Sequence, residues 1–482
     1  MTKASEFVAI VLAAGQGTRM KSALPKVLHP LLGRPMLSYP VQAALDAGAT
    51  QVVVVLGHGR ELIETELAQR FDARVVTALQ AEQRGTGDAA RCGALAMPDY
   101  QGIFLIFYGD APLITAAPLA QLITRVQDSD CPLALLTATA DDPTGYGRIL
   151  RDAHGMVKAI REHKDCNAEE LLVREWNPGV YAVRAPFFRA ALARLTTNNV
   201  QGELLLTDVV AMAAKEGGVA DLAWPEQELH GANDRADLVQ RERVLRLRRT
   251  TALGRQGVTI RDPETTFIDT DVAIASDVTI EGNVHLRGHS VIESGVHIDV
   301  GCVLRDVTVR AGATLLPYTI ATRSVIGERA QVGPFSHLRP ESELGTDVHV
   351  GNFVETKKTR LGKGAKANHL SYLGDGIIGE RVNVGAGTIF CNYDGFQKHV
   401  TVLQDGAFIG SDSQLVAPVT VGKDAYVATG TTVTKDVPDG ALAVGRARQE
   451  NKEGLALRLR ERLKGQADKA KAAAAQPKRS NS

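Results

Sequence analysis

A glycine-rich segment near the start of the chain carries the first residues that could do chemistry. It reads LAAGQGTRM over residues 12–20 and follows a short apolar run. Gly15 and Gly17 place backbone N–H groups where an anionic phosphate can approach without interference from a Cβ atom, and Arg19 adds a positive charge. Lys26 follows at a spacing that fits neither the Walker A motif nor the dinucleotide fingerprint. A phosphate-binding loop is therefore favoured over a kinase or dehydrogenase loop, and a plain strand-to-helix turn is the alternative.

A carboxylate ends a second apolar run. Asp110 follows IFLIFYG, which we predict to be a buried strand. Ligands of open α/β sheets collect at the carboxyl ends of the strands, and a carboxylate there is a natural Mg²⁺ ligand. The alternative is an aspartate that caps the turn before Ala111 and Pro112.

A histidine in the second half of the chain can exchange protons near neutral pH. His369 lies in NHLSYLGD, where its imidazole could accept a proton from an attacking nucleophile. A lone histidine is otherwise structural or simply exposed. Cys302 and Cys391 are potential nucleophiles, but neither belongs to a motif with an activating partner. Direct transfer is therefore preferred over a covalent intermediate on cysteine.

The elements that must position these residues differ between the two halves of the chain. The strand-like apolar runs of the first half lie at 8–13, 51–56, 102–107 and 133–138. Helical stretches separate them, so we expect a mostly parallel sheet wrapped by helices over residues 1–235. A charged stretch without strand signals follows, and we expect a connecting helix at 236–256.

A six-residue repeat fills most of the second half. Aliphatic residues recur at every sixth position from Ile274 to Leu304, from Ile326 to Val350 and from Ile409 to Val433. Each hexad can supply one short strand, so that successive coils stack into a parallel β-helix over 257–464. The segment 390–404 breaks this frame and is expected to be a loop that leaves the coil wall. The tail at 465–482 has no apolar pattern and is expected to be disordered.

Composition excludes several classes of partner. The 482 residues are enough for two or three domains, and the 55 basic and 55 acidic residues give a formal charge of zero. No global field therefore recruits nucleic acid or an anionic membrane, and no membrane insertion is expected because the first apolar run is too short. The five scattered cysteines contain no CxxC pair, which favours a cytoplasmic protein without a disulfide framework.

These motifs together resemble those of the bacterial bifunctional N-acetylglucosamine-1-phosphate uridylyltransferase and glucosamine-1-phosphate acetyltransferase family. The similar segments are LAAGQGTRM, PKVLHPLLGRPM, QAEQRGT, YGD, DPTGYGR and EHKD in the first half, and HLRP, VETKK, NHLSYLGD and CNYDG in the second. The resemblance covers nearly the whole chain. It implies an α/β, Rossmann-like domain of the nucleotide-diphospho-sugar transferase type, a linker helix, and a left-handed parallel β-helix of hexapeptide repeats. The general rule for connections between parallel strands would by itself favour a right-handed coil.

The resemblance implies a uridylyltransferase site in the first domain, where UTP reacts with a sugar 1-phosphate and pyrophosphate leaves. It also implies that Asp110 and Asn233 hold Mg²⁺. The residues expected to bind UTP or the UDP-sugar are Leu12, Ala13, Ala14, Gly15, Arg19, Lys26, Tyr108, Gly109, Asp110 and Asn233, with Gln80, Gly85 and Thr86 at the uracil and Gly147, Glu162 and Asn177 at the sugar. Pro178 stands where the family usually has threonine, and it removes a backbone donor beside the sugar.

The resemblance implies an acetyltransferase site in the β-helix. His369 would be the general base for the amino group of glucosamine 1-phosphate as that nitrogen attacks acetyl-CoA, and Glu355 could orient its ring. The amino-sugar phosphate would be bound by Arg339, Lys357, Tyr372 and Asn383, and acetyl-CoA by Ala386, Asn392, Tyr393, Ser411, Thr429 and Arg446. Thr429 stands where alanine is expected. The resemblance further implies a homotrimer, in which the loop near Asn392 completes a neighbour's site.

The leading prediction is therefore a two-headed enzyme that acetylates glucosamine 1-phosphate and then transfers uridylyl to it. The product, UDP-N-acetylglucosamine, would feed cell-wall and outer-membrane glycan synthesis. An alternative is an enzyme with nucleotidyl transfer alone and a scaffolding or allosteric β-helix, as in glucose-1-phosphate adenylyltransferases. The motif around His369 argues against that alternative, because a scaffold has no need of it. A purely structural or binding protein is disfavoured by Lys26, Asp110 and His369.

Overall fold

The computed structural model describes residues 6–474, which fall into two compact units. The first unit ends at Pro340 and the second begins at Glu341. The predicted end of the N-terminal domain at 235 and the predicted start of the β-helix at 257 both lie inside the first unit. The reason is that the linker helix and the first coils of the β-helix pack against each other and against the N-terminal domain.

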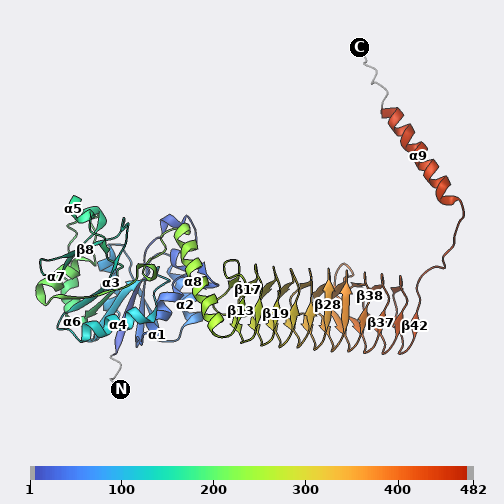
Figure 1. Cartoon of the computed structure of the whole chain (residues 1–482), viewed down its shortest axis with the longest axis horizontal. Coiled ribbons are helices and arrows are strands. Elements are labelled where there is room, and N and C mark those ends of the chain that lie inside the picture. The colour runs from blue at the N-terminus through green and yellow to red at the C-terminus, as the bar shows by residue number, and fades with distance from the viewer. Residues whose placement is uncertain (1–5, 475–482) are drawn as a thin grey trace, which may run out of the picture. The chain divides into compact units, whose positions relative to one another are not determined.

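A sheet of ten strands forms the centre of the N-terminal domain (Figure 1). Its order is β5 (Val75–Leu79), β4 (Gln51–Leu56), β1 (Phe7–Leu12), β6 (Ile103–Tyr108), β11 (Tyr181–Arg184), β7 (Leu133–Thr139), β10 (Glu175–Trp176), β8 (Arg148–Arg151) and β9 (Val157–Arg161), with β12 (Val219–Ala223) also paired to β7. The strands β5, β4, β1 and β6 are parallel, and β11 is antiparallel to both of its neighbours. The predicted parallel arrangement therefore holds for the half of the sheet that carries the glycine segment.

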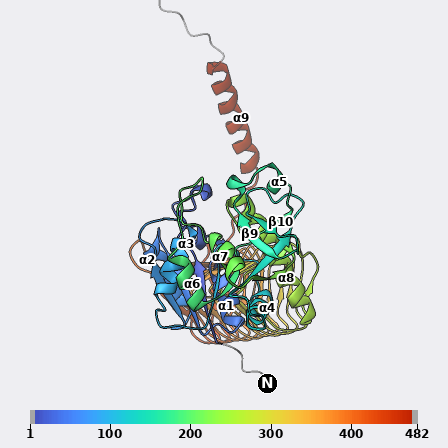
Figure 2. The same cartoon turned by 90° about the vertical axis from the view of Figure 1, so that its left-hand side faces the viewer.

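Helices cover both faces of this sheet because successive side chains of a strand point to opposite sides. Phe7, Ala9 and Val11 of β1 belong to one buried cluster, and Val8 and Ile10 belong to the other. The first cluster includes residues of α1 (Ser38–Asp46), α2 (Arg60–Arg70) and α4 (Ala116–Gln127), and the second includes residues of α3 (Thr86–Leu95), α6 (Ala185–Leu192) and α7 (Asp208–Glu216). Figure 2 shows these helices from the end of the domain. The sheet is thus packed on both faces by helices, and this packing holds the ends of β1 and β6 in place.

The predicted connecting helix is α8 (Arg235–Arg255). Asp234 caps its N-terminus, because its carboxylate accepts hydrogen bonds from the backbone N–H groups of Ala236 and Asp237. The helix contacts the hairpin strand β2 (Pro30–Leu31) and the first β-helix strands. It therefore holds the first coils against the N-terminal domain within the first unit.

The hexapeptide repeat forms three parallel sheets in each unit, as expected for a left-handed parallel β-helix. In the first unit they contain β13 (Thr259–Ile260), β16 (Thr279–Ile280), β19 (His297–Ile298), β22 (Thr314–Leu315) and β25 (Gln331–Val332); β14 (Phe267–Ile268), β17 (His285–Arg287), β20 (Val303–Arg305), β23 (Ile320–Thr322) and β26 (His337–Leu338); and β15 (Ala273–Ile274), β18 (Val291–Ile292), β21 (Thr308–Val309) and β24 (Val325–Ile326). The repeat residues Ile280, Leu286, Ile298 and Leu304 are fully buried. The six-residue frame therefore marks the inward-facing positions.

The second unit repeats the same arrangement. Its sheets contain β28 (His349–Asn352), β31 (Lys366–His369), β34 (Asn383–Val384), β37 (Phe408–Ile409), β40 (Tyr426–Val427) and β42 (Leu442–Ala443); β29 (Glu355–Lys357), β32 (Tyr372–Gly374), β35 (Ile389–Cys391), β38 (Gln414–Val416) and β41 (Thr432–Val433); and β27 (Glu343–Leu344), β30 (Arg360–Leu361), β33 (Gly376–Ile378), β36 (Thr401–Leu403) and β39 (Val419–Val421). One helix, α9 (Leu455–Ala474), follows the coils. None of the helices in residues 6–474 has the length and apolar character needed to cross a bilayer.

Two expectations need correction. The loop predicted at 390–404 is shorter, because Phe390 is buried within β35 and residues 401–403 form β36. The tail expected to be disordered from 465 is helical as far as Ala474, since α9 continues through it. Alanine, lysine and glutamine are strong helix formers, so this segment needs no apolar stripe to favour a helix. The remainder of the predicted tail lies outside the described residues.

Candidate active sites

Two cavities lie at the carboxyl ends of β1 and β6 in the first unit. Their volumes are about 360 Å³ and about 420 Å³. The first lies against the glycine segment, and the second against residues 144–147. They share four lining residues, Arg19, Tyr108, Asp110 and Asn233. The two cavities together therefore form one composite site at the edge where ligands of such sheets bind.

Most of the predicted nucleotide and sugar residues line this composite site. The first cavity is lined by Leu12, Ala13, Ala14, Gly15, Arg19, Lys26, Gln80, Gly85, Thr86, Tyr108, Asp110 and Asn233, and the second adds Gly147, Glu162 and Asn177. Gly109 lines neither cavity. A Cβ atom there would come within 2.8 Å of the Leu37 side chain, so close packing explains this glycine.

A cluster of charged and amide groups stands where the two cavities meet. Lys26 Nζ donates to Asp110 Oδ2 at 2.5 Å and to Asn233 Oδ1 at 3.3 Å. Arg19 Nη2 donates to the same Asn233 oxygen at 3.2 Å. Residues from three separate segments thus bring two cations and two oxygen ligands to one point. This arrangement suits the phosphates of a nucleotide and a hard cation bound to them.

The glycine segment leaves room for a ligand and fits closely against Lys26. Gly17 has a φ of +63°, and a Cβ atom there would lie 2.4 Å from the Cβ of Lys26. No atom lies within 4 Å of the corresponding Cβ position at Gly15, which faces the cavity. One glycine therefore permits the turn and the other permits close approach of an anion.

A partly buried carboxylate, that of Glu162, lies in the second cavity. Thr207 donates a hydrogen bond to Glu162 Oε1 at 3.0 Å. Burial raises the pKa of Glu162, and the nearby carboxylates of Asp165 and Asp208 raise it further. Asn177 beside it is held by Tyr181 and by the backbone N–H of Gly179. Fixed acceptors of this kind can orient the hydroxyl groups of a sugar.

In the second unit, the ring of His369 is held by a neighbouring coil. Nδ1 of His369 lies 3.0 Å from Oδ1 of Asn352, and the two residues are paired between β28 and β31. Since a side-chain amide oxygen can only accept, the ring carries its proton on Nδ1 when this bond forms. The other nitrogen, Nε2, is then free to accept a proton. His369 is exposed, so a substrate can reach it.

Four of the predicted acetyl-CoA residues, Ala386, Ser411, Thr429 and Arg446, lie along one corner of successive coils. The register pairs Ala367 with Val384, Val384 with Ile409, and Ile409 with Val427. The residues two positions further along each coil are His369, Ala386, Ser411 and Thr429. Neighbouring strands are about 4.8 Å apart, so these four residues form a row along the corner. Arg446 extends it, because its Nη1 donates to the Thr429 carbonyl oxygen at 2.6 Å.

A shared carboxylate joins two further predicted residues. Asp375 Oδ2 accepts from Nδ2 of Asn392 at 2.5 Å and lies 3.6 Å from Nζ of Lys357. Asp375 follows β32, the strand that contains Tyr372. Lys357 is thereby positioned by a residue one coil away.

Comparison with known proteins agrees with this two-site architecture. A family described as the MobA-like NTP transferase domain matches residues 9–206. The "Bifunctional protein GlmU" of Sorangium cellulosum is 59% identical over 473 residues, covering 97% of this chain and 100% of that protein. Proteins with the same name from Stutzerimonas stutzeri and Trichlorobacter lovleyi are 49% and 46% identical, covering 92% and 94% of this chain and 97% and 98% of their own lengths. The chain belongs to the GlmU family.

GlmU family membership applies to both units, because the similarity extends through nearly all of the chain. Arg339 follows β26 in the first unit, whereas the other predicted acetyltransferase residues lie in the second. Asn383 begins β34. Tyr393 lies in the loop after β35, with Lys398 Nζ 4.6 Å from the centroid of its ring.

Three residues with clear contacts were not among the predicted site residues of this GlmU family member. Gln83 lines the first cavity and donates to the Ala14 carbonyl oxygen at 2.6 Å. Gln83 belongs to the QAEQ segment, so it could have been predicted from the motif. Asn352 lies 17 residues before His369, which is one coil of the repeat. Asp375 is the last residue of the NHLSYLGD segment, so the motif contained it, but its contacts with Lys357 and Asn392 depend on the stacking of coils.

Proposed function

We propose that this chain makes UDP-N-acetylglucosamine in two steps at two separate sites. The β-helix acetylates glucosamine 1-phosphate with acetyl-CoA, and the N-terminal domain then transfers uridylyl from UTP to the acetylated sugar phosphate. The observation that carries the proposal is that each unit has its own arrangement of reactive groups. The first unit has the cluster of Lys26, Asp110 and Asn233, and the second has an exposed His369 held by Asn352.

For uridylyl transfer, the phosphate oxygen of the sugar attacks the α-phosphorus of UTP, and the bond to pyrophosphate breaks. The protein aligns the reactants and stabilises the charge on the phosphates. Arg19, Lys26 and the N–H groups of the glycine segment act on the triphosphate in the first cavity. Glu162 and Asn177 hold the sugar in the second.

Mg²⁺ is the proposed cofactor, with Asp110 and Asn233 as its protein ligands. Their oxygen atoms are of the kind that Mg²⁺ prefers, and both lie against Lys26. No group of three His, Cys, Asp or Glu side chains within residues 6–474 could hold a metal. Substrate phosphate oxygens and water would complete the shell of the ion, which would supply neutralising charge there.

For acetyl transfer, the amino nitrogen of glucosamine 1-phosphate attacks the thioester carbon, the C–S bond breaks, and coenzyme A leaves. Nε2 of His369 accepts the proton that the nitrogen loses. Lys357 and Arg339 would bind the sugar phosphate, with Tyr372 and Asn383 beside it. The row of Ala386, Ser411, Thr429 and Arg446 would hold the coenzyme with Asn392 and Tyr393. Glu355 remains a candidate for orienting the imidazole.

We also propose a cytoplasmic homotrimer. Tyr318 and Phe335 stack at 5.2 Å on successive coils of the first unit and are both about half exposed, at 49% and 50%. Exposed aromatic stacks of this kind favour burial against a second copy. All five cysteines are free thiols, in keeping with a reducing compartment. Analytical ultracentrifugation should give about three times the mass of the chain.

The proposed function is tested by following free thiol and pyrophosphate separately, in phosphate-free buffer with Mg²⁺. Substitution His369→Ala should abolish thiol release and leave uridylyl transfer to N-acetylglucosamine 1-phosphate intact. Substitution Asp110→Ala should do the reverse. Release of pyrophosphate without any release of thiol by the wild type would show that the β-helix is a scaffold.

A further inference from the structure

A third cavity in the first unit shares no lining residue with the composite active site. Its volume is about 340 Å³, and it lies between α1, the end of α2 and the first coils of the β-helix. The helices contribute Ser38, Gln42, Gln69 and Arg70. Such a volume is within the range of small-molecule pockets.

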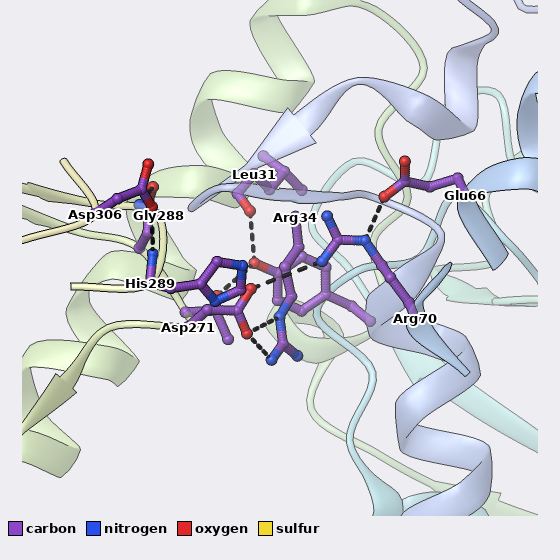
Figure 3. A network of polar contacts seen from close by, with 11 residues as sticks. Leu31, Arg34, Glu66, Arg70, Asp271, Gly288, His289 and Asp306 are labelled. Atoms are coloured by element: carbon purple, nitrogen blue, oxygen red, sulfur yellow. Dashed lines mark hydrogen bonds and ion pairs between the residues drawn. The ribbon is translucent and has the colours of Figure 1, made fainter. Parts of the chain in front are cut away.

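Arginine side chains surround a single aspartate at this cavity (Figure 3). Arg34 donates to Asp271 Oδ1 through both Nε, at 3.0 Å, and Nη2. Arg70 Nη1 lies 3.7 Å from the other carboxylate oxygen and its Nε bonds to Glu66. His289 stands on the coil side of the same carboxylate. The lining thus contains two guanidinium groups and an imidazole but one carboxylate.

A third arginine makes the surroundings more cationic. Arg249 of α8 donates to the Val272 carbonyl oxygen at 2.5 Å, and its Nε is buried without a hydrogen-bond partner among the described residues. Burial lowers the pKa of Arg249, and repulsion from Arg34 lowers it further, whereas Asp271 opposes the shift. Asp271 and Glu66 together place two carboxylates against the guanidinium groups of Arg34, Arg70 and Arg249, so they only partly offset the positive charge at this place.

We propose that this cavity binds a small anion that carries a phosphate dianion, held by Arg34 and Arg70 in competition with Asp271. Arginine forks match the geometry of phosphate oxygens, and the remaining lining groups, Ser38, Gln42 and Gln69, can donate hydrogen bonds to them. The excess of guanidinium groups disfavours a cation, and the scarcity of apolar lining disfavours a hydrophobic ligand. Inorganic phosphate and a phosphorylated metabolite share the chemistry that this site recognises.

The test is calorimetric titration of the full chain with inorganic phosphate and, separately, with glycerol 3-phosphate. Mg²⁺, UDP-N-acetylglucosamine and coenzyme A are present at saturation to fill the nucleotide, sugar and coenzyme subsites, and the binding that the Arg34 and Arg70 variants lose is assigned to the third cavity. The wild type should bind saturably. Substitutions Arg34→Gln and Arg70→Gln should each weaken binding by about tenfold or more. Tighter binding of glycerol 3-phosphate identifies a phosphate ester as the ligand class, and tighter binding of phosphate identifies the free ion.

Two further variants separate binding from damage to the fold. Substitution Asp271→Asn removes the competing charge and should strengthen binding, a gain that misfolding cannot produce. Substitution Arg60→Gln is the matched control, because Arg60 is on the same helix, is paired with Glu64 at 2.7 Å and lies outside the cavity. Absence of saturable binding by the wild type would overturn the proposal. So would equal affinities in the wild type and in the Arg70 and Asp271 variants.

Discussion

At the scale of single residues, the contact between Asn352 and His369 determines which ring nitrogen is available as a base. The bond to Nδ1 leaves Nε2 free, and it also limits rotation of an exposed ring. A residue that acts through the base should affect turnover more than substrate binding. We therefore expect Asn352 to be a positioning residue with its own kinetic signature.

We expect Asn352→Ala to lower kcat for acetyl transfer by about tenfold or more, with little change in KM. Asn352→Asp should move the acidic limb of the pH–rate profile upward, since a carboxylate favours the protonated imidazole. The measurement is the rate of thiol release between pH 5 and 9, with uridylyl transfer as the internal control. Unchanged kcat and pH profile in both variants would show that Asn352 has no positioning role.

The ionised form of Glu162 lowers the stability of the folded state, because the side chain is partly buried. Its pKa is raised in the folded state, so its ionisation on going from acid to neutral pH destabilises the folded state relative to the unfolded one. The protonated Glu162 side chain contributes fully to the stability of the fold when the pH is below its pKa in the unfolded chain. This contribution is lost as the pH rises through its higher pKa in the folded protein.

Glu162→Gln should therefore raise the melting temperature at pH 7 and remove this pH dependence, while weakening sugar binding. Exposed Glu169→Gln is the control, and a lower melting temperature in Glu162→Gln at pH 7 would contradict the argument.

At the scale of elements, the glycine segment and the Lys26 segment fit together too closely for a side chain. Gly17→Ala would place a Cβ atom 2.4 Å from that of Lys26 and would strain a φ of +63°. We expect the displaced lysine to lower uridylyl transfer by about 100-fold, because such transfer depends on alignment. Acetyl transfer should be unchanged.

The matched control for Gly17 is Gly155, in the turn between β8 and β9. It has a φ of +79°, but a Cβ atom there would have no neighbour within 4 Å. Gly155→Ala therefore reproduces the backbone strain without the clash. Equal rates in the two variants would show that strain, and not the position of Lys26, limits activity.

The sequence predicted the elements better than it predicted contacts between them. The hexad frame identified buried positions such as Leu286 because strand periodicity is local. Lys26 and Asp110 were chosen from their positions after the glycine segment and after a strand, and Asn233 from motif resemblance. The structure brings Asp110 and Asn233 within hydrogen-bond distance of Lys26. Asp375 lies in the NHLSYLGD motif, but its role could not be predicted, because its link between Lys357 and Asn392 exists only after coils stack. The helical continuation of α9 was missed because apolar pattern was weighed above helix propensity.

At the scale of the whole molecule, the two active sites belong to arrangements of residues that share no group. The cluster at Asp110 uses residues of the N-terminal domain, and the proposed base, His369, is oriented within the second unit. His369 is exposed, so the acetylated sugar phosphate can leave it for solvent. Nothing in the chemistry of either step requires the intermediate to remain bound between them.

This independence predicts complementation between inactive variants. Neither Asp110→Ala nor His369→Ala protein alone should convert glucosamine 1-phosphate to UDP-N-acetylglucosamine. An equimolar mixture should restore the conversion after a lag, because the intermediate must first accumulate in solution to be captured by the other variant. The measurement is product formation with time at several protein concentrations, and the lag should shorten as concentration rises. A mixture that stays inactive, although each variant retains its own partial reaction, would mean that the intermediate passes only between sites of one assembly.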